Sequence, residues 1–209
     1  MNNPKGSPLS VRQGGFGNTQ NVTVINYLFD GSISDYKVLK DITTAVGSKD
    51  YSVLVCAPPI ERASETTIKI FGLITDKIRE SKIDLVIGGG MSIIPDGRGY
   101  PHLNEHDFVI EKKCNAVVIF AEDYSTFIQL SHLSIIKDEH PASSIELFCF
   151  YDKGGVSESN FMMTGPIAFF EQAAKGSLYD TADIGDRSEI IVDKVIQDIL
   201  RHKALRSKR

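Results

Sequence analysis

Residues 51–90 read YSVLVCAPPIERASETTIKIFGLITDKIRESKIDLVIGGG, and this stretch decides the fold class. Residues 52–57 and 83–90 are short apolar runs, which are typical of strands buried on both faces of a sheet. Between them, residues 62–80 place apolar side chains near helical spacing, with charged residues in between. Two buried strands joined by an amphipathic helix form a βαβ unit, whose crossover is right-handed in nearly all known structures. The stretch therefore predicts a parallel pair of strands.

The same alternation of apolar runs and amphipathic segments continues to the C-terminus. We expect helices at 103–113, 124–137, 165–176 (ended by Gly176) and 186–203, strands at 115–123 and 145–152, and a short last strand within 160–166. Strands that alternate with helices predict a three-layer Rossmann-like α/β fold. In that fold an open, mostly parallel sheet carries helices on both faces.

The N-terminal region differs in composition from the rest. Residues 1–20 are rich in Gly, Asn, Ser and Gln and have no apolar periodicity, so we expect a mobile tail. Residues 21–29 (NVTVINYLF) predict a strand, and residues 35–46 predict a short helix. Residues 14–26 (GGFGNTQNVTVIN) can also pair with the same piece of another subunit. We therefore expect one Rossmann-like domain over 21–209 and a homo-oligomer.

Composition is ordinary for a globular chain of 209 residues, with 42% hydrophobic and 24% charged residues. The net charge of −4 provides no general attraction to nucleic acid or to acidic membranes. The last nine residues carry five basic side chains and no acid, so this tail can contact a polyanion such as nucleic acid. A solvated helix end is the favoured interpretation, since cations suit a helix C-terminus. Their basic members are Arg201, Lys203, Arg206, Lys208 and Arg209.

Location is predicted from what the sequence lacks. No apolar run approaches the roughly 20 residues that span a bilayer, and the N-terminus has no signal-peptide stretch, so we expect a cytoplasmic protein without a membrane partner. Cys56, Cys114 and Cys149 lie in or beside apolar segments and form no CxxC pair. They predict buried, reduced thiols.

In sheets of this type, ligands bind beyond the carboxyl ends of the strands. The segment after the first strand contains Pro58 and Arg62. Arg62 stands near the start of a helix, where a guanidinium and backbone N–H groups together can hold a phosphate. The alternative is an exposed arginine without such a role.

Three consecutive glycines, Gly88, Gly89 and Gly90, follow the second strand. Glycines let a ligand approach the backbone closely and expose N–H donors, although neither a P-loop nor a GxGxxG pattern is present. Asp96 and Arg98 lie in the loop that follows and are further ligand candidates. The alternative is that the glycines only form a turn.

Glu122, Asp123 and Ser125 stand at the end of the third apolar strand. A pair of acids at a strand end suits ribose hydroxyls or general acid–base chemistry, and Ser125 can cap a helix or bind a phosphate. The same acids also occur as ordinary helix N-terminal charges. His102, Glu105 and His106 have a spacing that zinc sites use, but a surface helix is the favoured interpretation, and we predict neither a metal nor a cofactor.

The order of VLVCAPPIER, NAVVIFAEDYSTFIQL and TGPIAFF, ending in a terminal helix, resembles a known superfamily over about residues 50–203. This is the Rossmann-like group of nucleoside 2-deoxyribosyltransferases and SLOG domains of bacterial conflict and antiphage systems. The resemblance implies a glutamate on the helix after the third strand, which acts as nucleophile or contacts ribose. This chain has Gln129 there, and an amide cannot be that nucleophile. Either Glu122 or Glu105 takes the role, or the protein binds without cleaving, or the positions correspond differently.

Three functional hypotheses follow. The leading one is a nucleotide- or nucleoside-binding domain in which cleavage of an N-glycosidic bond is open, with Glu122, Asp123 or Glu105 as the carboxylate that stabilises positive charge on the sugar. The second is a non-catalytic nucleotide sensor or accessory subunit that regulates a partner protein, which Gln129 favours. The third is a structural interaction module.

Overall fold

The computed structural model describes residues 51–90, 100–111, 114–140, 144–155 and 161–206, all within the unit Ser34–Arg209. Its five strands form one parallel sheet in the order β2-β1-β3-β4-β5. The strands are β1 (Ser52–Cys56), β2 (Asp84–Gly88), β3 (Ala116–Ala121), β4 (Glu146–Tyr151) and β5 (Ser177–Asp180). The predicted parallel α/β sheet is confirmed.

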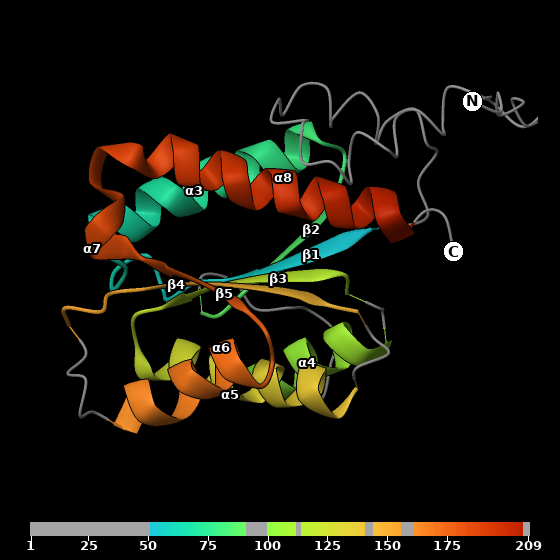
Figure 1. The fold of residues 1–209 in the computed structure, drawn as a ribbon, viewed down its shortest axis with the longest axis horizontal. Helices are drawn as coiled ribbons and strands as arrows, with labels where there is room; N and C mark the ends of the chain where they lie inside the picture. The colour runs from blue at the N-terminus through green and yellow to red at the C-terminus, as the bar shows by residue number, and fades with distance from the viewer. Residues whose placement is uncertain (1–50, 91–99, 112–113, 141–143, 156–160, 207–209) are drawn as a thin grey trace, which may run out of the picture. The chain divides into compact units, whose positions relative to one another are not determined.

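Helices cover both faces of the sheet. Helices α3 (Glu65–Glu80) and α8 (Ser188–Arg206) lie on one face, and α4 (Pro101–Glu111), α5 (Tyr124–Glu139) and α6 (Ala168–Gln172) lie on the other (Figure 1). A π-helical turn, η2 (Met163–Ile167), leads into α6, and α7 (Thr181–Ile184) with the 3₁₀ turn η3 (Gly185–Arg187) leads into α8. The three layers match the expected architecture. No helix among the described residues is long and apolar enough to cross a membrane.

The strand order creates a switch point between β1 and β3. These strands are neighbours in the sheet, but the chain leaves β1 into α3 on one face and leaves β3 into α5 on the other. The two loops therefore diverge at the carboxyl edge, the geometry at which doubly wound sheets bind their ligands.

Side chains of the central strands pack on both faces of the sheet. On β3, Val117 and Ile119 join the cluster packed against α5, while Phe120 turns toward α3, where its ring meets Phe71 at 6.1 Å. Phe120, Phe150 and Tyr179 are in register on β3, β4 and β5, and each successive pair of rings stacks at 5.0 Å between centroids. That distance is close to the spacing of hydrogen-bonded strands, so the rings form a continuous ladder across three strands.

One predicted element is wrong. The strand expected within 160–166 does not form, because residues 161–172 are helical and contain Pro166 inside the π-helical turn. Ile167 and Phe170 are both buried at helical spacing, which places them on one face against the core. The fifth strand is instead the four-residue β5, which follows Gly176. A Cβ at Gly176 would collide with the Phe170 ring, so the glycine lets the backbone before β5 lie directly against that ring.

The remaining predicted elements agree within a few residues. The helix expected at 103–113 begins at Pro101, where proline suits the first helical position. The final helix runs over Ser188–Arg206. The predicted tail at 1–20, strand at 21–29 and helix at 35–46 lie outside the described residues.

Candidate functional site

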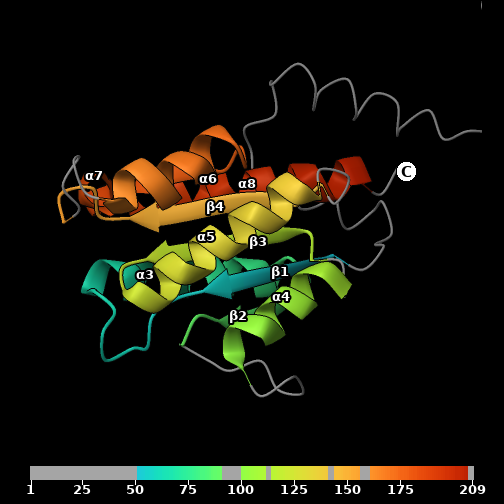
Figure 2. The ribbon, with the colours of Figure 1, turned by 90° about the horizontal axis from the view of Figure 1, so that it is seen from below.

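The carboxyl edge at the switch point brings together the segments that follow the first three strands. The Ala57 N–H donates to the Gly88 carbonyl at 3.3 Å, which joins the end of β1 to the end of β2. The Ser125 hydroxyl oxygen lies 3.5 Å from the Gly89 carbonyl oxygen, which places the start of α5 beside the glycine turn. The arrowheads of β1 and β4 in Figure 2 point toward this edge. Asp96 and Arg98 lie outside the described residues.

Glu122 links the end of β3 to the first turn of α3. Its carboxylate accepts hydrogen bonds from the Ser64 N–H at 3.0 Å, the Ser64 hydroxyl at 2.6 Å and the Thr67 hydroxyl at 2.6 Å. Ser64 is the N-cap of α3, and its own oxygen accepts from the Thr67 N–H. A carboxylate at a helix N-terminus is favourable, because the helix dipole places partial positive charge there. Glu122 thus holds the two sides of the switch point together.

Asp123 is the N-cap of α5. One carboxylate oxygen, Oδ1, accepts from the Ser125 hydroxyl at 2.7 Å, the Thr126 N–H at 2.9 Å and the Thr126 hydroxyl at 2.9 Å. Burial raises the pKa of Asp123, but these hydrogen bonds and the nearby Arg62 guanidinium outweigh burial and leave the pKa below its usual value. Asp123 is therefore ionised at neutral pH.

The three glycines at the end of β2, Gly88 to Gly90, are required by the packing of the chain itself. Gly89 and Gly90 have φ values of +87° and +117°, which side chains rarely adopt. A Cβ at Gly89 would collide with the Ala57 backbone, and one at Gly90 would lie 3.0 Å from Pro59. A Cβ at Gly88 would collide with the carboxylate of Glu105.

Glu105 is a buried carboxylate behind this turn. Only 3% of its surface is exposed, and it accepts from the Gly89 N–H at 2.8 Å and from the Gln129 Nε2 at 2.6 Å. Burial raises the pKa of Glu105, and the hydrogen bonds from Gly89 and Gln129 and the charge of His102 oppose that rise. The Gly89 N–H, predicted as a donor to a ligand, is thus already bonded to a carboxylate of the chain.

Gln129 points into the protein beside Glu105. Its side chain is 7% exposed, and its Oε1 has no hydrogen-bond partner among the described residues. A glutamate at this position would bring a second carboxylate against Glu105, and two such charges at this distance repel. The local environment therefore explains why an amide stands where the resemblance implies an acid.

The other predicted ligand residues differ in exposure. Pro58 is buried directly after β1, whereas Arg62 and Ser125 are exposed. The Arg62 N–H and the Ala63 N–H both donate to the Pro59 carbonyl, so a tight turn precedes α3 and carries the guanidinium to the edge.

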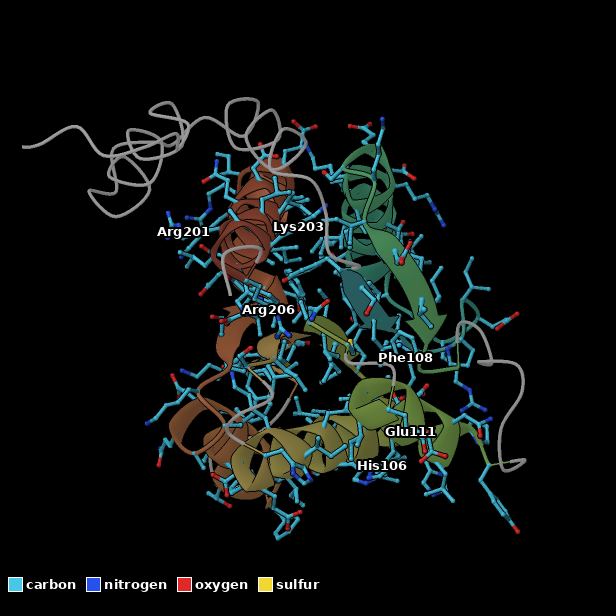
Figure 3. The ribbon with its side chains drawn as sticks, turned by 90° about the vertical axis from the view of Figure 1, so that its right-hand side faces the viewer. His106, Phe108, Glu111, Arg201, Lys203 and Arg206 are labelled. Atoms are coloured by element: carbon cyan, nitrogen blue, oxygen red, sulfur yellow. The ribbon has the colours of Figure 1, made fainter. Side chains whose placement is uncertain are left out.

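His106 of α4 packs against a histidine of α5. His106 stacks on His132 of α5 with ring centroids 5.0 Å apart, and its Nδ1 lies 3.2 Å from Asp107. Figure 3 shows His106 on the side of this layer that faces away from the sheet. The part of the chain that the structure describes contains no group of three or more His, Cys, Asp or Glu residues suited to a metal ion.

The cysteines and the described basic residues of α8 are buried or contact other residues of the chain. All three cysteines are free and buried, and burial raises the pKa of Cys114 to about 12, which suppresses the reactive thiolate. On α8 (Figure 3), Lys203 is buried, Arg206 donates to the Ser144 hydroxyl at 2.6 Å, and Arg201 lies 3.8 Å from Asp198. Lys208 and Arg209 lie outside the described residues.

Two parts of this site are absent from the sequence analysis. The first is Ser64 with Thr67, whose signal is an N-cap serine before a helix. The second is the contact of Glu105 with Gly89 and Gln129. The expectation that Glu105 lies on a surface helix is wrong, because its side chain is 3% exposed. Glu105 precedes the buried Phe108 and Val109 by three and four positions, the spacing of one helix face.

Comparison of the chain with protein-family models and with curated proteins finds no match.

Proposed function

We propose that this protein binds a nucleoside or nucleotide at the carboxyl edge of the sheet, between the loops that follow β1 and β3. The observation that carries the proposal is the strand order 2-1-3-4-5 with the switch point between β1 and β3. Doubly wound sheets bind their ligands, mononucleotides among them, at that point, because two loops diverge there and leave backbone and side-chain groups facing solvent. Arg62, Asp123 and Ser125 are the side chains that converge there.

Each of these side chains has a distinct role in the proposal. The exposed guanidinium of Arg62 pairs with a phosphate when the ligand carries one. The hydrogen bonds of Asp123 within the described chain all use Oδ1, so Oδ2 is the oxygen that accepts a sugar hydroxyl. The Ser125 hydroxyl donates its hydrogen to Asp123, so its oxygen is the atom that accepts a hydrogen bond from the ligand.

Cleavage of an N-glycosidic bond is the second candidate function. The lowered pKa of Asp123 favours it, since an ionised carboxylate stabilises the positive charge that develops on the sugar carbon. Glu105 does not suit that role, because it is buried and bonded to Gly89 and Gln129. Glu122 is held by three donors from α3. These constraints favour binding alone, as in a sensor, over turnover.

The test is a thermal-shift screen of the full chain against nucleosides, nucleotides and NAD, with chromatography of the same wells for a released base. A ligand at 100 times its Kd adds about 2.7 kcal/mol of stability, an upward shift of a few degrees. Binding with a released base establishes the enzyme, and binding without release establishes the sensor. No shift across the whole panel contradicts the proposal.

Variants locate the site. Asp123→Asn should weaken binding at least tenfold, while Asp180→Asn should not. Asp180 is the matched control, because it is likewise the N-cap acid of a helix, α7, directly after β5 and away from the switch point. Arg62→Ala should weaken the binding of phosphorylated ligands more than the binding of nucleosides. Its control is Arg79→Ala, at the other end of α3, which should leave both affinities unchanged. An equal loss of ligand affinity in Asp180→Asn and in Asp123→Asn would argue against this site.

A further inference from the structure

The carboxyl edge contains three sets of donors of the kind that hold phosphate groups in α/β proteins. They are the Gly89 N–H in the glycine turn, the first turn of α3 and the first turn of α5. The two helices begin at this edge on opposite faces of the sheet (Figure 1). Phosphate groups bind at such places because N–H groups point outward there and the helix dipole favours negative charge.

Two of these sets are bonded to carboxylates of the chain itself at the glycine turn and at α5. Glu105 accepts from the Gly89 N–H at 2.8 Å. Asp123 accepts from the Thr126 N–H and from the Thr126 hydroxyl, both at 2.9 Å. A phosphate that approached either set would therefore meet a carboxylate already in place.

The third set, at the start of α3, is bonded to Glu122. The Ser64 N–H at 3.0 Å, the Ser64 hydroxyl at 2.6 Å and the Thr67 hydroxyl at 2.6 Å all donate to this one carboxylate. Hydrogen bonds to an ionised acceptor are roughly twice as strong as neutral ones, so a phosphate does not easily displace Glu122. Glu122 thus occupies the place at which a phosphate would otherwise bind α3.

The charge of this edge has the same sign as a phosphate. The described segments that form it, 57–66, 88–90 and 121–126, contain four acidic side chains and one basic side chain. The acids are Glu61, Glu65, Glu122 and Asp123, and the cation is Arg62. Arg62 lies close enough to Asp123 for its charge to act on that carboxylate. The sequence 91–99, which follows Gly90, contains one acid and one cation and leaves this balance unchanged.

We propose that this edge selects an unphosphorylated nucleoside over the corresponding nucleotide, an inference that rests on the binding function proposed above. A sugar hydroxyl is neutral and donates to the Oδ2 atom of Asp123. A phosphate monoester carries about 1.5–2 negative charges at neutral pH and would face the carboxylates of Glu122 and Asp123. Like charges brought together lower affinity, so the selectivity comes from repulsion within the site. Arg62 offsets only part of this repulsion.

Glu122 is the residue that determines this selectivity. Its three hydrogen bonds go to α3, and it is not among the side chains proposed to contact the ligand. A glutamine at this position keeps the size of the side chain and an oxygen that accepts a hydrogen bond, but it removes the charge. Glu122→Gln should therefore change the preference between charged and neutral ligands.

The test is isothermal titration calorimetry of the full chain with adenosine, guanosine, cytidine and uridine, each beside its 5′-monophosphate. A nucleoside that binds the wild type should bind at least tenfold more tightly than its monophosphate, a difference of about 1.4 kcal/mol. In Glu122→Gln the ratio of the two dissociation constants should fall at least fivefold. Thermal unfolding verifies that the variant folds.

Glu80→Gln is the matched control. It removes the same charge from an exposed glutamate at the other end of α3, a helix of 16 residues and therefore about 24 Å long. That distance exceeds the screening length of about 8 Å at physiological salt, so the ratio should not change. Salt is a second readout, because it screens repulsion between charges but not a steric clash. Raising NaCl from about 50 to about 500 mM should reduce the wild-type ratio more than the ratio in Glu122→Gln.

The outcomes separate this inference from the binding function. A monophosphate that binds the wild type as tightly as its nucleoside overturns the selectivity and leaves the binding function intact. An equal change of the ratio in Glu122→Gln and Glu80→Gln also overturns it. If no nucleoside or nucleotide binds, the binding function fails, and inorganic phosphate then tests the occupied donors. Compared with NaCl of equal ionic strength, phosphate should raise the melting temperature of Glu122→Gln more than that of the wild type, and equal shifts overturn the inference.

Discussion

At the scale of single residues, the decisive feature is a carboxylate placed where an anionic ligand was expected. The Gly89 N–H, which the sequence offers to a phosphate, donates to Glu105. Gly88 must lack a side chain because the Glu105 carboxylate takes that space. The glycine run is thus explained by the contacts of Glu105 and of the loop after β1, while the groups that remain for a ligand are side chains on neighbouring loops.

The first prediction concerns the charge of Glu105. Because burial raises its pKa above the unfolded value, the stability contributed by this group is present at acidic pH and is lost as the pH rises through the folded-state pKa. Glu105→Gln removes this charge. The melting temperature of the variant minus that of the wild type should therefore become more positive from pH 4.5 to pH 7.5. A difference that becomes more negative over this range would show that the carboxylate is stabilising when ionised.

The second prediction concerns the contact between Gly88 and Glu105. Gly88→Ala should destabilise the protein by about 1–3 kcal/mol, because its methyl group overlaps the carboxylate. The same change in a Glu105→Ala background should cost less, with a coupling of about 0.5–3 kcal/mol. Urea unfolding of the four proteins measures this double-mutant cycle. Additive effects would mean that Gly88 is required for another reason.

At the scale of elements, the carboxyl edge is organised by the N-termini of two helices. Ser64 caps α3 and donates to Glu122, and Asp123 caps α5. The two residues after β3 therefore contact the N-termini of helices on opposite faces of the sheet. This arrangement explains why two acids follow one strand. Each acid meets a different set of backbone and hydroxyl donors.

The third prediction separates these two roles. Asp123→Ala removes the N-cap of α5 and should lower the free energy of unfolding by about 0.5–2 kcal/mol. Glu122→Ala leaves the Ser64 and Thr67 hydroxyls without their acceptor and should cost about 1–3 kcal/mol. In a Ser64→Ala and Thr67→Val background, the cost of Glu122→Ala should fall. Chemical denaturation provides each value, and an unchanged cost would mean that Glu122 stabilises α3 through its charge alone.

At the scale of the whole molecule, stacked rings join three strands of the sheet to α3. Phe150 is fully buried at the centre of the ladder, between Phe120 and Tyr179. The short strand β5 contributes few residues, so its position depends on this stacking and on its pairing with β4.

The fourth prediction tests the ladder. Phe150→Ala should lower the free energy of unfolding by about 3–5 kcal/mol, because it leaves a large cavity in the core. Phe161→Ala is the control and should change stability by less than about 0.5 kcal/mol, because Phe161 is 77% exposed. Equilibrium unfolding in urea measures both. Similar costs for the two variants would mean that Phe161 packs against another molecule or segment.

The sequence by itself determined the parallel α/β class and the places of β1 to β4, because burial on both faces and helical periodicity are local patterns. It placed Glu122 and Asp123 at a helix N-terminus, but its capping candidate, Ser125, is wrong, because Asp123 is the N-cap of α5 and accepts from the Thr126 N–H. Only the tertiary structure decided the strand order, the short β5 and the helix that replaced the strand expected within 160–166.

The tertiary structure likewise decided what the site residues contact. Glu105 meets Gly89 and Gln129 across 16 and 24 positions, and Glu122 meets Ser64 across 58. No local pattern specifies such pairs. Their physical reason is that buried donors and acceptors must find partners, and the folded chain alone determines which groups lie within hydrogen-bonding distance.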